Sequence, residues 1–283
     1  MQFRKALSFL GTDVAKDTRA ALGLGTAATV SAKGWRGMIH GLTLSNNVSD
    51  ATNDIDIAAG EAWDNANDAL LDLTSGLTKR LDASWAVGTN QGGLDTGSKA
   101  NSTWYHVWLI RRSDTGVVDV LFSTSGSSPT MPSNYDQKRR IGTIRTNSSG
   151  VIRPFRQWGD QFEWSGDSIR DLDTTSPATS ATNLTVTVPP IEGVVWIGWI
   201  LVFASSAGVK SASISSGGTA SWNVGSGLGR ILCNTPGGSG DMAVVHGTAV
   251  VNGSGQIQYG AASNVNISVV IDTKAWVDHR GSY

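Results

Sequence analysis

Six basic side chains and no acidic one lie between residues 138 and 156. They are Lys138, Arg139, Arg140, Arg145, Arg153 and Arg156. Arginine meets carboxylates and phosphates through paired hydrogen bonds, so a face shared by these cations could bind an anionic glycan or the phosphates of a lipopolysaccharide. The alternative, which we prefer, is that the cations pair with acidic neighbours within one chain or across subunits. The candidate acids are Asp119, Asp136, Asp160 and Glu163.

The stretch Gly166-Asp167-Ser168 offers a candidate nucleophile in Ser168. It is similar to the Gly-Asp-Ser block of the SGNH-type hydrolases, a family that supplies the catalytic base as an Asp-x-x-His sequence near the C-terminus. The two late histidines here, His246 and His279, have no aspartate three residues before them. The block also does not end a buried strand and open a helix, as a nucleophile on a sharp turn requires. We therefore interpret it as part of a linker.

Metal and cofactor signals are weak. Asp54 and Asp56 would share one face of a strand close to Asp50, and could offer carboxylates to calcium. The glycine and the terminal glutamate of a calcium-binding loop are missing, so solvated carboxylates at a strand edge are the preferred interpretation. The four histidines have no metal-ligand spacing. They are His40, His106, His246 and His279. The sequence predicts no metal site, no cofactor and no enzymatic activity.

The composition indicates many short strands joined by tight turns. Glycine accounts for 34 of the 283 residues and charged residues for only 16%, which is atypical of an α/β enzyme. The formal net charge of −1 creates no field that would attract nucleic acid or an anionic membrane. No apolar run reaches the length of about 18 residues that a membrane-spanning helix needs. The single cysteine, Cys233, excludes an intrachain disulfide.

Residues 34–165 are predicted to form a central antiparallel β domain. Its clearest part consists of two hairpins, rich in aromatic and β-branched residues, with turn sequences between their arms. The arms are expected at 104–112 and 117–123, and at 140–146 and 151–158. Further strands are expected at 38–44, 54–59 and 77–82, a helical turn at 66–73, and a long polar loop at 88–103.

The polar stretch 166–182 is predicted to be a linker. Beyond it, residues 183–283 are predicted to form a C-terminal β-sandwich, similar to a jelly roll, because glycine-rich turns separate strands at intervals of about ten residues. Seven strands are expected, at 184–188, 194–203, 209–214, 229–233, 242–251, 256–259 and 265–271. No internal repeat of fixed period is present, which disfavours a propeller or a β-helix.

Residues 1–33 form an N-terminal attachment segment that is rich in alanine and leucine and predicts a short helix at 13–22. Because an isolated helix of about 12–15 residues is only marginally stable in water, this one should pack on a partner such as copies of itself. Val14, Leu22 and Leu24 are the candidate residues for attachment to a partner or for oligomerisation.

Residues 20–29, which contain the sequence ALGLGTAAT, resemble a motif of tail fibre and tail-associated proteins of double-stranded DNA bacteriophages. In those proteins the motif precedes or punctuates β-rich, usually trimeric, receptor-binding regions. The middle of the chain, TWYHVWLIRRSDTGVVDVLFS followed by YDQKRRIGTI, is similar to segments of prophage tail proteins.

The resemblance implies a phage tail fibre or receptor-binding protein, made in the host cytoplasm and carried in the tail of the virion as a homotrimer. Its N-terminus would join other tail or baseplate proteins, and its C-terminal half would bind a host-surface polysaccharide. Trp222 and Tyr259, predicted on C-terminal loops, are the candidate receptor contacts. The eleven tryptophans could equally pack cores and subunit interfaces. A purely structural tail or baseplate component and a glycan-cleaving enzyme remain as alternatives.

Overall fold

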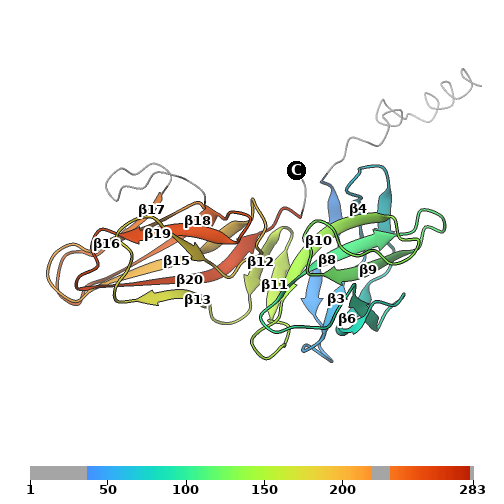
Figure 1. The fold of residues 1–283 in the computed structure, drawn as a ribbon, viewed down its shortest axis with the longest axis horizontal. Helices are drawn as coiled ribbons and strands as arrows, with labels where there is room; N and C mark the ends of the chain where they lie inside the picture. The colour runs from blue at the N-terminus through green and yellow to red at the C-terminus, as the bar shows by residue number, and fades with distance from the viewer. Residues whose placement is uncertain (1–36, 218–229, 281–283) are drawn as a thin grey trace, which may run out of the picture.

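The computed structural model describes residues 37–217 and 230–280. Within these ranges the protein is all-β, with twenty strands in four sheets and no helix, arranged as two lobes side by side (Figure 1). No helix in this part of the chain could therefore cross a membrane. The helix expected at 13–22, with Val14, Leu22 and Leu24, lies outside the described residues, as does Trp222.

The N-terminal lobe contains the first ten strands. Their bounds are β1 Ile39–Gly41, β2 Leu44–Asn46, β3 Asp54–Ile57, β4 Gly60–Trp63, β5 Leu70–Leu73, β6 Leu77–Ser84, β7 Gln91–Leu94, β8 Trp104–Arg111, β9 Val118–Ser123 and β10 Gln137–Arg145. Seven of them form one sheet in the order β10-β8-β9-β7-β6-β3-β2, and β1-β4-β5 form a smaller one. The large sheet nearly closes into a barrel, since a Cβ built on Gly142 of β10 would lie 2.5 Å from Leu44 of β2, at the opposite end of the sheet.

The large sheet is mixed, which corrects the expectation of an antiparallel domain. Strand β7 runs parallel to both β6 and β9. It lies inside the range 88–103 that the sequence predicts as a loop, because its residues Gln-Gly-Gly-Leu show no apolar alternation. Tertiary packing requires the glycines, as a Cβ on Gly93 would lie 2.7 Å from the ring of Phe122. Strand β7 forms because its glycines let neighbouring strands pack closely, and a search for alternating apolar residues cannot predict such a strand.

Of the two predicted hairpins, the first is confirmed and the second is wrong. Strands β8 and β9 pair antiparallel, with Trp108 opposite Leu121. The chain after β10 does turn at 147–150, and its arms are joined by the bridge between Thr146 and Ile152 and by the hydrogen bond from the Arg153 N–H to the Arg145 C=O at 2.8 Å, but the pairing ends there. Pro154 follows, and a proline supplies no backbone N–H for a ladder. The next strand, β11 (Phe155–Trp158), instead pairs with β12 (Gln161–Trp164).

Two shorter elements of the N-terminal lobe also differ from expectation. The range 66–73 holds a turn and then β5, not a helical turn, because its Leu-Leu-Asp-Leu alternates between exposed and buried positions. The strand expected at 38–44 is interrupted at Leu42, whose φ of 54° lies in the left-handed region. Strand β3 confirms the strand expected at 54–59.

The C-terminal lobe contains the last eight strands. Their bounds are β13 Ile169–Thr174, β14 Thr182–Thr185, β15 Val195–Ala204, β16 Ser211–Ser215, β17 Arg230–Asn234, β18 Met242–Val250, β19 Gln256–Ala261 and β20 Ile267–Val277. The last seven match the seven strands predicted for residues 183–283. Strand β13 lies inside the predicted linker 166–182. It is a polar edge strand whose single partner, β20, is about one hundred residues away in sequence, so no local pattern marks it.

These eight strands form two four-stranded layers, β13-β20-β15-β18 and β14-β19-β16-β17. The chain crosses from one layer to the other at every connection except β16 to β17, which is a hairpin. Buried side chains of both layers share one core, in which Val202 of β15, Ile214 of β16 and Cys233 of β17 are all inaccessible or nearly so. The predicted two-layered C-terminal arrangement is therefore present at the level of sheets and packing.

Strand β20 connects the lobes. One of its edges pairs with β15 along its length, and the other pairs with β13 at Val269–Thr273 and with β12 at Ala275–Val277. The β11–β12 hairpin is bound in turn to β2, where the Leu44 N–H donates to Gln157 Oε1 at 2.8 Å. Backbone pairing thus continues from the C-terminal lobe into the edge of the N-terminal one.

An aromatic cluster fills this junction. Trp276 of β20 stacks on Phe162 at 5.3 Å and 7° between planes, and lies 4.7 Å from Trp164 and 5.8 Å from Trp104 between ring centroids. Trp276, Trp164 and Phe162 are each at most 2% exposed. These tryptophans serve internal packing, one of the two roles that the sequence left open.

We expect Trp276→Ala to lower the free energy of unfolding by about 3–5 kcal/mol, because it leaves a cavity among rings from both lobes. Trp158→Ala is the control, since that ring is 54% exposed and its loss should cost under about 1 kcal/mol. Urea unfolding followed by circular dichroism measures both. Equal losses in the two variants would contradict the role given to the cluster.

Candidate functional site

The predicted cationic residues do not form one exposed face. Arg139 and Arg140 of β10 are 1% and 6% exposed. The guanidinium of Arg145 lies over the ring of Trp104 at 5.4 Å, and that of Arg153 over Trp164 at 5.9 Å. Arg156 is exposed on β11. Cation–π packing and burial therefore use most of these charges within the fold.

Arg140 binds a carboxylate that the sequence did not suggest. Its guanidinium donates to the two oxygens of Asp278 at 2.5 and 2.7 Å, and both side chains are buried. The hydroxyl of Thr143 lies 3.4 Å from Asp278 and also 3.4 Å from Nδ1 of His106. The pair links β10 to the segment after β20. Sequence reasoning missed it because 138 positions separate the partners.

The four acids named as candidate partners bind other groups. Asp119 pairs with buried Lys79 at 2.8 Å, Asp160 with Arg280 at 2.5 Å, and Glu163 with Lys274 at 2.9 Å. Asp136 accepts a hydrogen bond from the backbone N–H of Ser113 at 3.0 Å. These carboxylates are occupied within the chain, but not by the predicted arginines.

Burial sets the electrostatics of the Arg140 site. It lowers the pKa of His106 to about 4, and the nearby Arg140 guanidinium adds to that effect. Burial alone would raise the pKa of Asp278, but the charge and hydrogen bonds of Arg140 outweigh it, so the pKa is lowered. At neutral pH the site holds a neutral imidazole beside a buried ion pair. This arrangement suits a structural role, in which the pair holds β10 to the segment after β20.

The Gly166-Asp167-Ser168 block leads into β13 and does not open a helix. The Ser168 hydroxyl lies 3.4 Å from Asp272, whose carboxylate also accepts from Trp199 Nε1 at 3.1 Å and from Arg170 Nε at 3.2 Å. The ring of His246 lies 5.1 Å from that of Trp199. Ser168 therefore has a carboxylate, not an imidazole, as its hydrogen-bond neighbour.

Asp50, one of the three candidate calcium ligands, is bound to polar groups of its own loop. Asp50 accepts from the backbone N–H groups of Thr52 and Asn53 at 3.0 and 3.2 Å. Burial raises the pKa of Asp54, with the negative charge of Asp50 adding to the effect. Among the residues that the structure describes, no three His, Cys, Asp or Glu side chains are grouped so that they could hold a metal ion.

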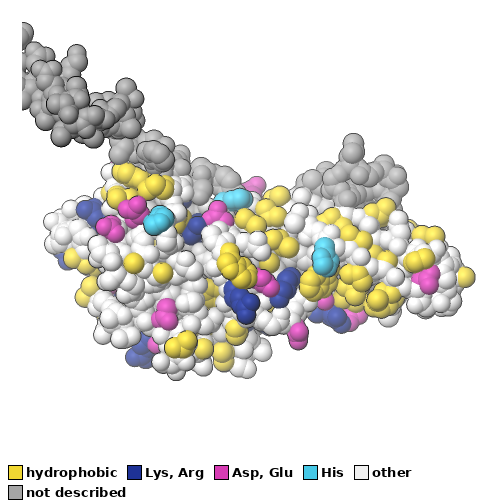
Figure 2. All heavy atoms as spheres, turned by 180° about the vertical axis from the view of Figure 1, so that it is seen from behind, with side chains coloured by type: hydrophobic (Ala, Val, Ile, Leu, Met, Phe, Trp, Pro, Cys, Tyr) yellow, Lys and Arg dark blue, Asp and Glu magenta, His cyan; other side chains and the backbone are white. Residues whose placement is uncertain are grey.

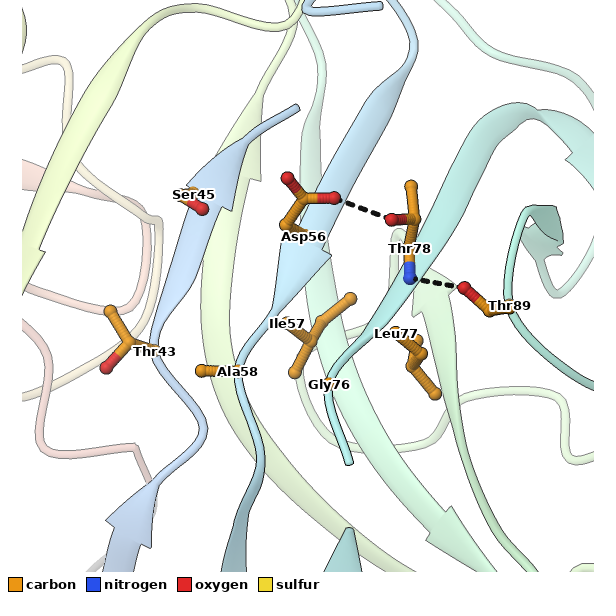
Figure 3. Close-up of a pocket in the computed structure, with 9 residues that line it drawn as sticks. All are labelled: Thr43, Ser45, Asp56, Ile57, Ala58, Gly76, Leu77, Thr78 and Thr89. Carbon is orange, nitrogen blue, oxygen red and sulfur yellow. Dashed lines mark hydrogen bonds between the residues drawn. The ribbon is translucent and has the colours of Figure 1, made fainter. Parts of the chain in front are cut away.

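A groove on the outer side of β2, β3 and β6 is the best candidate binding site. It consists of two adjoining hollows, of about 300 and 450 Å³, that share Gly76, Leu77 and Thr89. Hydroxyl groups dominate its polar lining, and Figure 3 shows those of the first hollow. The hydroxyl-bearing residues are Thr43, Ser45, Thr74, Ser75, Thr78 and Thr89.

The carboxylate of Asp56 lines the first hollow and is held in place by hydrogen bonds. Its Oδ1 accepts from the Thr78 hydroxyl at 2.6 Å (Figure 3). The same oxygen accepts from Asn47 Nδ2 at 2.8 Å. Leu77 forms part of the apolar floor, and Asp72 lines the second hollow. No lysine or arginine lines either hollow. Oriented hydroxyls and carboxylates without cations suit a neutral polyhydroxylated ligand and disfavour an anionic one.

Sequence reasoning did not find this groove. Threonine and serine are common in strands, and only the pairing of β2 with β3 and of β3 with β6, with Thr89 bonded to Thr78, brings these hydroxyls together. Of the predicted receptor contacts, Tyr259 lies within β19 and is 8% exposed, so it is not on a loop. Its burial reflects a central position in its sheet, opposite Thr182 and Ile214.

Comparisons with known proteins provide no family. No family model matches the chain, and no curated protein matches it. Among solved structures, the crystal structure of the infectious bursal disease virus VP2 subviral particle aligns with 87% of this chain and 74% of that chain, at 13% sequence identity. The TM-score of 0.21 is too low for this likeness to carry an argument.

Replacing one partner of the Arg140–Asp278 pair should be costly. We expect Asp278→Ala to lower the free energy of unfolding by about 3–5 kcal/mol, because it leaves a buried guanidinium without its carboxylate. The double variant Arg140→Met/Asp278→Leu should recover most of that loss, since no charge then remains buried. Chemical denaturation of the three proteins measures this. A double variant no more stable than the single one would contradict it.

Acidification should act through His106. The unfolded chain takes up a proton near pH 6.5, whereas the folded chain does so only near pH 4. Stability should therefore fall by about 3 kcal/mol as pH falls from about 6.5 to about 4, and level off below. His106→Gln should flatten this part of the stability–pH curve, while the loss from Asp278 starts only below about pH 4. Identical curves for the variant and the wild type would refute this origin.

Proposed function

We propose that the protein is a receptor-binding component of a phage tail that attaches to a neutral polysaccharide of the host surface through the groove around Asp56. The observation that carries the proposal is the cation-free groove, lined by six hydroxyl-bearing residues around a carboxylate held by Thr78 and Asn47. The phage-tail assignment itself is supported by the resemblance of residues 20–29 to a tail-fibre motif.

The choice of a neutral glycan follows from where the charges lie. An anionic glycan would need exposed cations, but Arg139 and Arg140 are buried and two other arginines of the run stack on tryptophans. The groove offers the carboxylates of Asp56 and Asp72, which would repel an anion. Saccharide hydroxyls can both donate to such carboxylates and accept from threonine and serine hydroxyls.

We further propose that the C-terminal lobe is a jelly roll. Its layers β13-β20-β15-β18 and β14-β19-β16-β17, with nearly every connection crossing between layers, support this assignment. Jelly rolls occur in viral capsid and lectin domains, where rigid sheets carry binding surfaces. The resemblance adds a homotrimer in the virion tail, with the N-terminus joined to other tail or baseplate proteins. Several weak saccharide sites per particle would then act together through avidity.

A glycan-cleaving enzyme is the second candidate, because two carboxylates, Asp56 and Asp72, line adjoining hollows. Glycosidases use a pair of carboxylates about 5 to 9 Å apart. Adhesion is preferred because Oδ1 of Asp56 already accepts hydrogen bonds from the Thr78 hydroxyl and the Asn47 amide, so one of its two oxygens is not free for a reacting saccharide. Release of reducing ends from a bound polysaccharide would favour the enzyme. A purely structural tail component would bind no saccharide.

The test is a glycan array of neutral, amino and acidic saccharides probed with the full chain, followed by calorimetry on any saccharide retained. We expect neutral saccharides to bind, and Asp56→Ala and Thr78→Val each to weaken binding about tenfold, as loss of one charge-assisted hydrogen bond predicts. Asp173→Asn is the matched control, since this exposed carboxylate lies on the other lobe. Retention of acidic saccharides alone, or unchanged affinity in both groove variants, would overturn the proposal.

A further inference from the structure

Strand β18 is one of the long edge strands of the described chain. It runs for nine residues, Met242–Val250, and pairs only with β15 among the strands of its sheet. An edge strand presents a row of backbone N–H and C=O groups to its surroundings, and a second strand can pair with them.

The other long edge strands of the described chain carry features that block such pairing. Strand β10 has four cationic residues and a register shift between Arg140 and Gly142. Strand β13 carries Arg170, Asp171 and Asp173. Strand β18, with the sequence MAVVHGTAV, has no Asp, Glu, Lys, Arg or proline, and its register with β15 is continuous. Charges, prolines and bulges are three of the usual protections of an edge, and β18 has none of these three.

The free backbone groups of β18 can be identified from its last residue. The C=O of Val250 accepts from the Gly217 N–H at 2.9 Å, and its N–H donates to Ser216 Oγ at 3.1 Å. Both groups of Val250 therefore point away from β15. Because this direction repeats every second residue of an antiparallel strand, Met242, Val244, His246 and Thr248 also direct theirs away from β15, where no other strand of the described residues pairs with them. The side chains of these four residues are all exposed.

We propose that β18 pairs antiparallel with β18 of a second copy of this chain, about a two-fold axis at Val245. This register uses the four free residues and leaves Val250 in its present bonds. Met242 of one copy then lies opposite Thr248 of the other, and Val244 opposite His246. Each such pair exchanges two hydrogen bonds, and the two β18-containing sheets become one.

A second copy fits this edge better than a chain of another kind for two reasons. The four residues Met242, Val244, His246 and Thr248 are spaced symmetrically about Val245, so an antiparallel copy of the same strand places an acceptor opposite every donor. A two-fold contact of this kind is complete with two chains. No like charges meet, because none of the four residues is acidic, lysine or arginine. The adjoining outer face is also apolar, with Met242 53%, Val244 46% and Phe203 38% exposed. Figure 2 shows hydrophobic side chains gathered over this lobe.

The experiment is native mass by light scattering on the full chain at about 50 µM, a range in which specific edge pairing should be populated. We expect an even number of 29.7 kDa chains in the wild type and half that number in Val244→Lys, which places a charge on the edge. Val244→Pro should also halve the mass, because the N–H that it removes points away from β15. Val265→Lys is the matched control, since this valine is 60% exposed outside any strand, and it should keep the wild-type mass.

The outcome separates this contact from the trimer that the proposed function includes. If both exist, the wild type holds six chains and Val244→Lys holds three. A wild type of one or three chains would overturn the β18 contact, and three chains would leave the trimer standing. Unchanged mass in both Val244 variants, with circular dichroism like that of the wild type, would overturn it as well.

Discussion

The shared use of β20 is the constraint on which the arrangement of this protein depends. One strand supplies a central position in the C-terminal lobe and, through Ala275–Val277, the partner of the β11–β12 hairpin that leans on β2. The two lobes therefore cannot separate without breaking backbone pairing and exposing Trp276. Asp278, just beyond the strand, adds the buried bond to Arg140. Strand β20 and Asp278 thus stabilise the interface between the lobes, and their partners there, β12 and Arg140, lie more than one hundred positions earlier in the sequence.

The burial of Arg140 at this interface is one reason why the basic residues of the range 138–156 do not form one basic surface. A guanidinium can be buried when a carboxylate and hydrogen-bond partners are available, and it can lie flat on an indole when they are not. The N-terminal lobe uses both arrangements, at Arg140 and at Arg145 with Arg153. The groove on the same lobe is lined by hydroxyls and carboxylates without a cation, and this chemistry selects the class of receptor that we propose.

In the C-terminal lobe, the inner faces of the two layers stabilise the fold, and the outer face with the β18 edge is where we propose association with a second copy. The inner faces of its two layers form a continuous apolar core. On the outer face, Asp272 binds Trp199, Arg170 and Ser168 near one edge, while β18 at the other edge carries apolar side chains and open backbone groups. A satisfied polar network resists pairing with other chains, whereas an uncharged open strand invites it. The asymmetry assigns the self-contact to β18.

The sequence by itself determined the all-β class, the β8–β9 hairpin and the seven C-terminal strands, because alternation, β-branched residues and glycine turns act over a few residues. It could not predict the parallel placement of β7, the strand β13 inside a polar stretch, or the redirection of β11 to β12, since each depends on partners distant in sequence. The same limit applies to the site. Arg140 was visible, but its partner Asp278 and the groove around Asp56 were not. Only the tertiary structure decided which polar side chains meet, because burial and closure of the sheet act between residues that no local pattern connects.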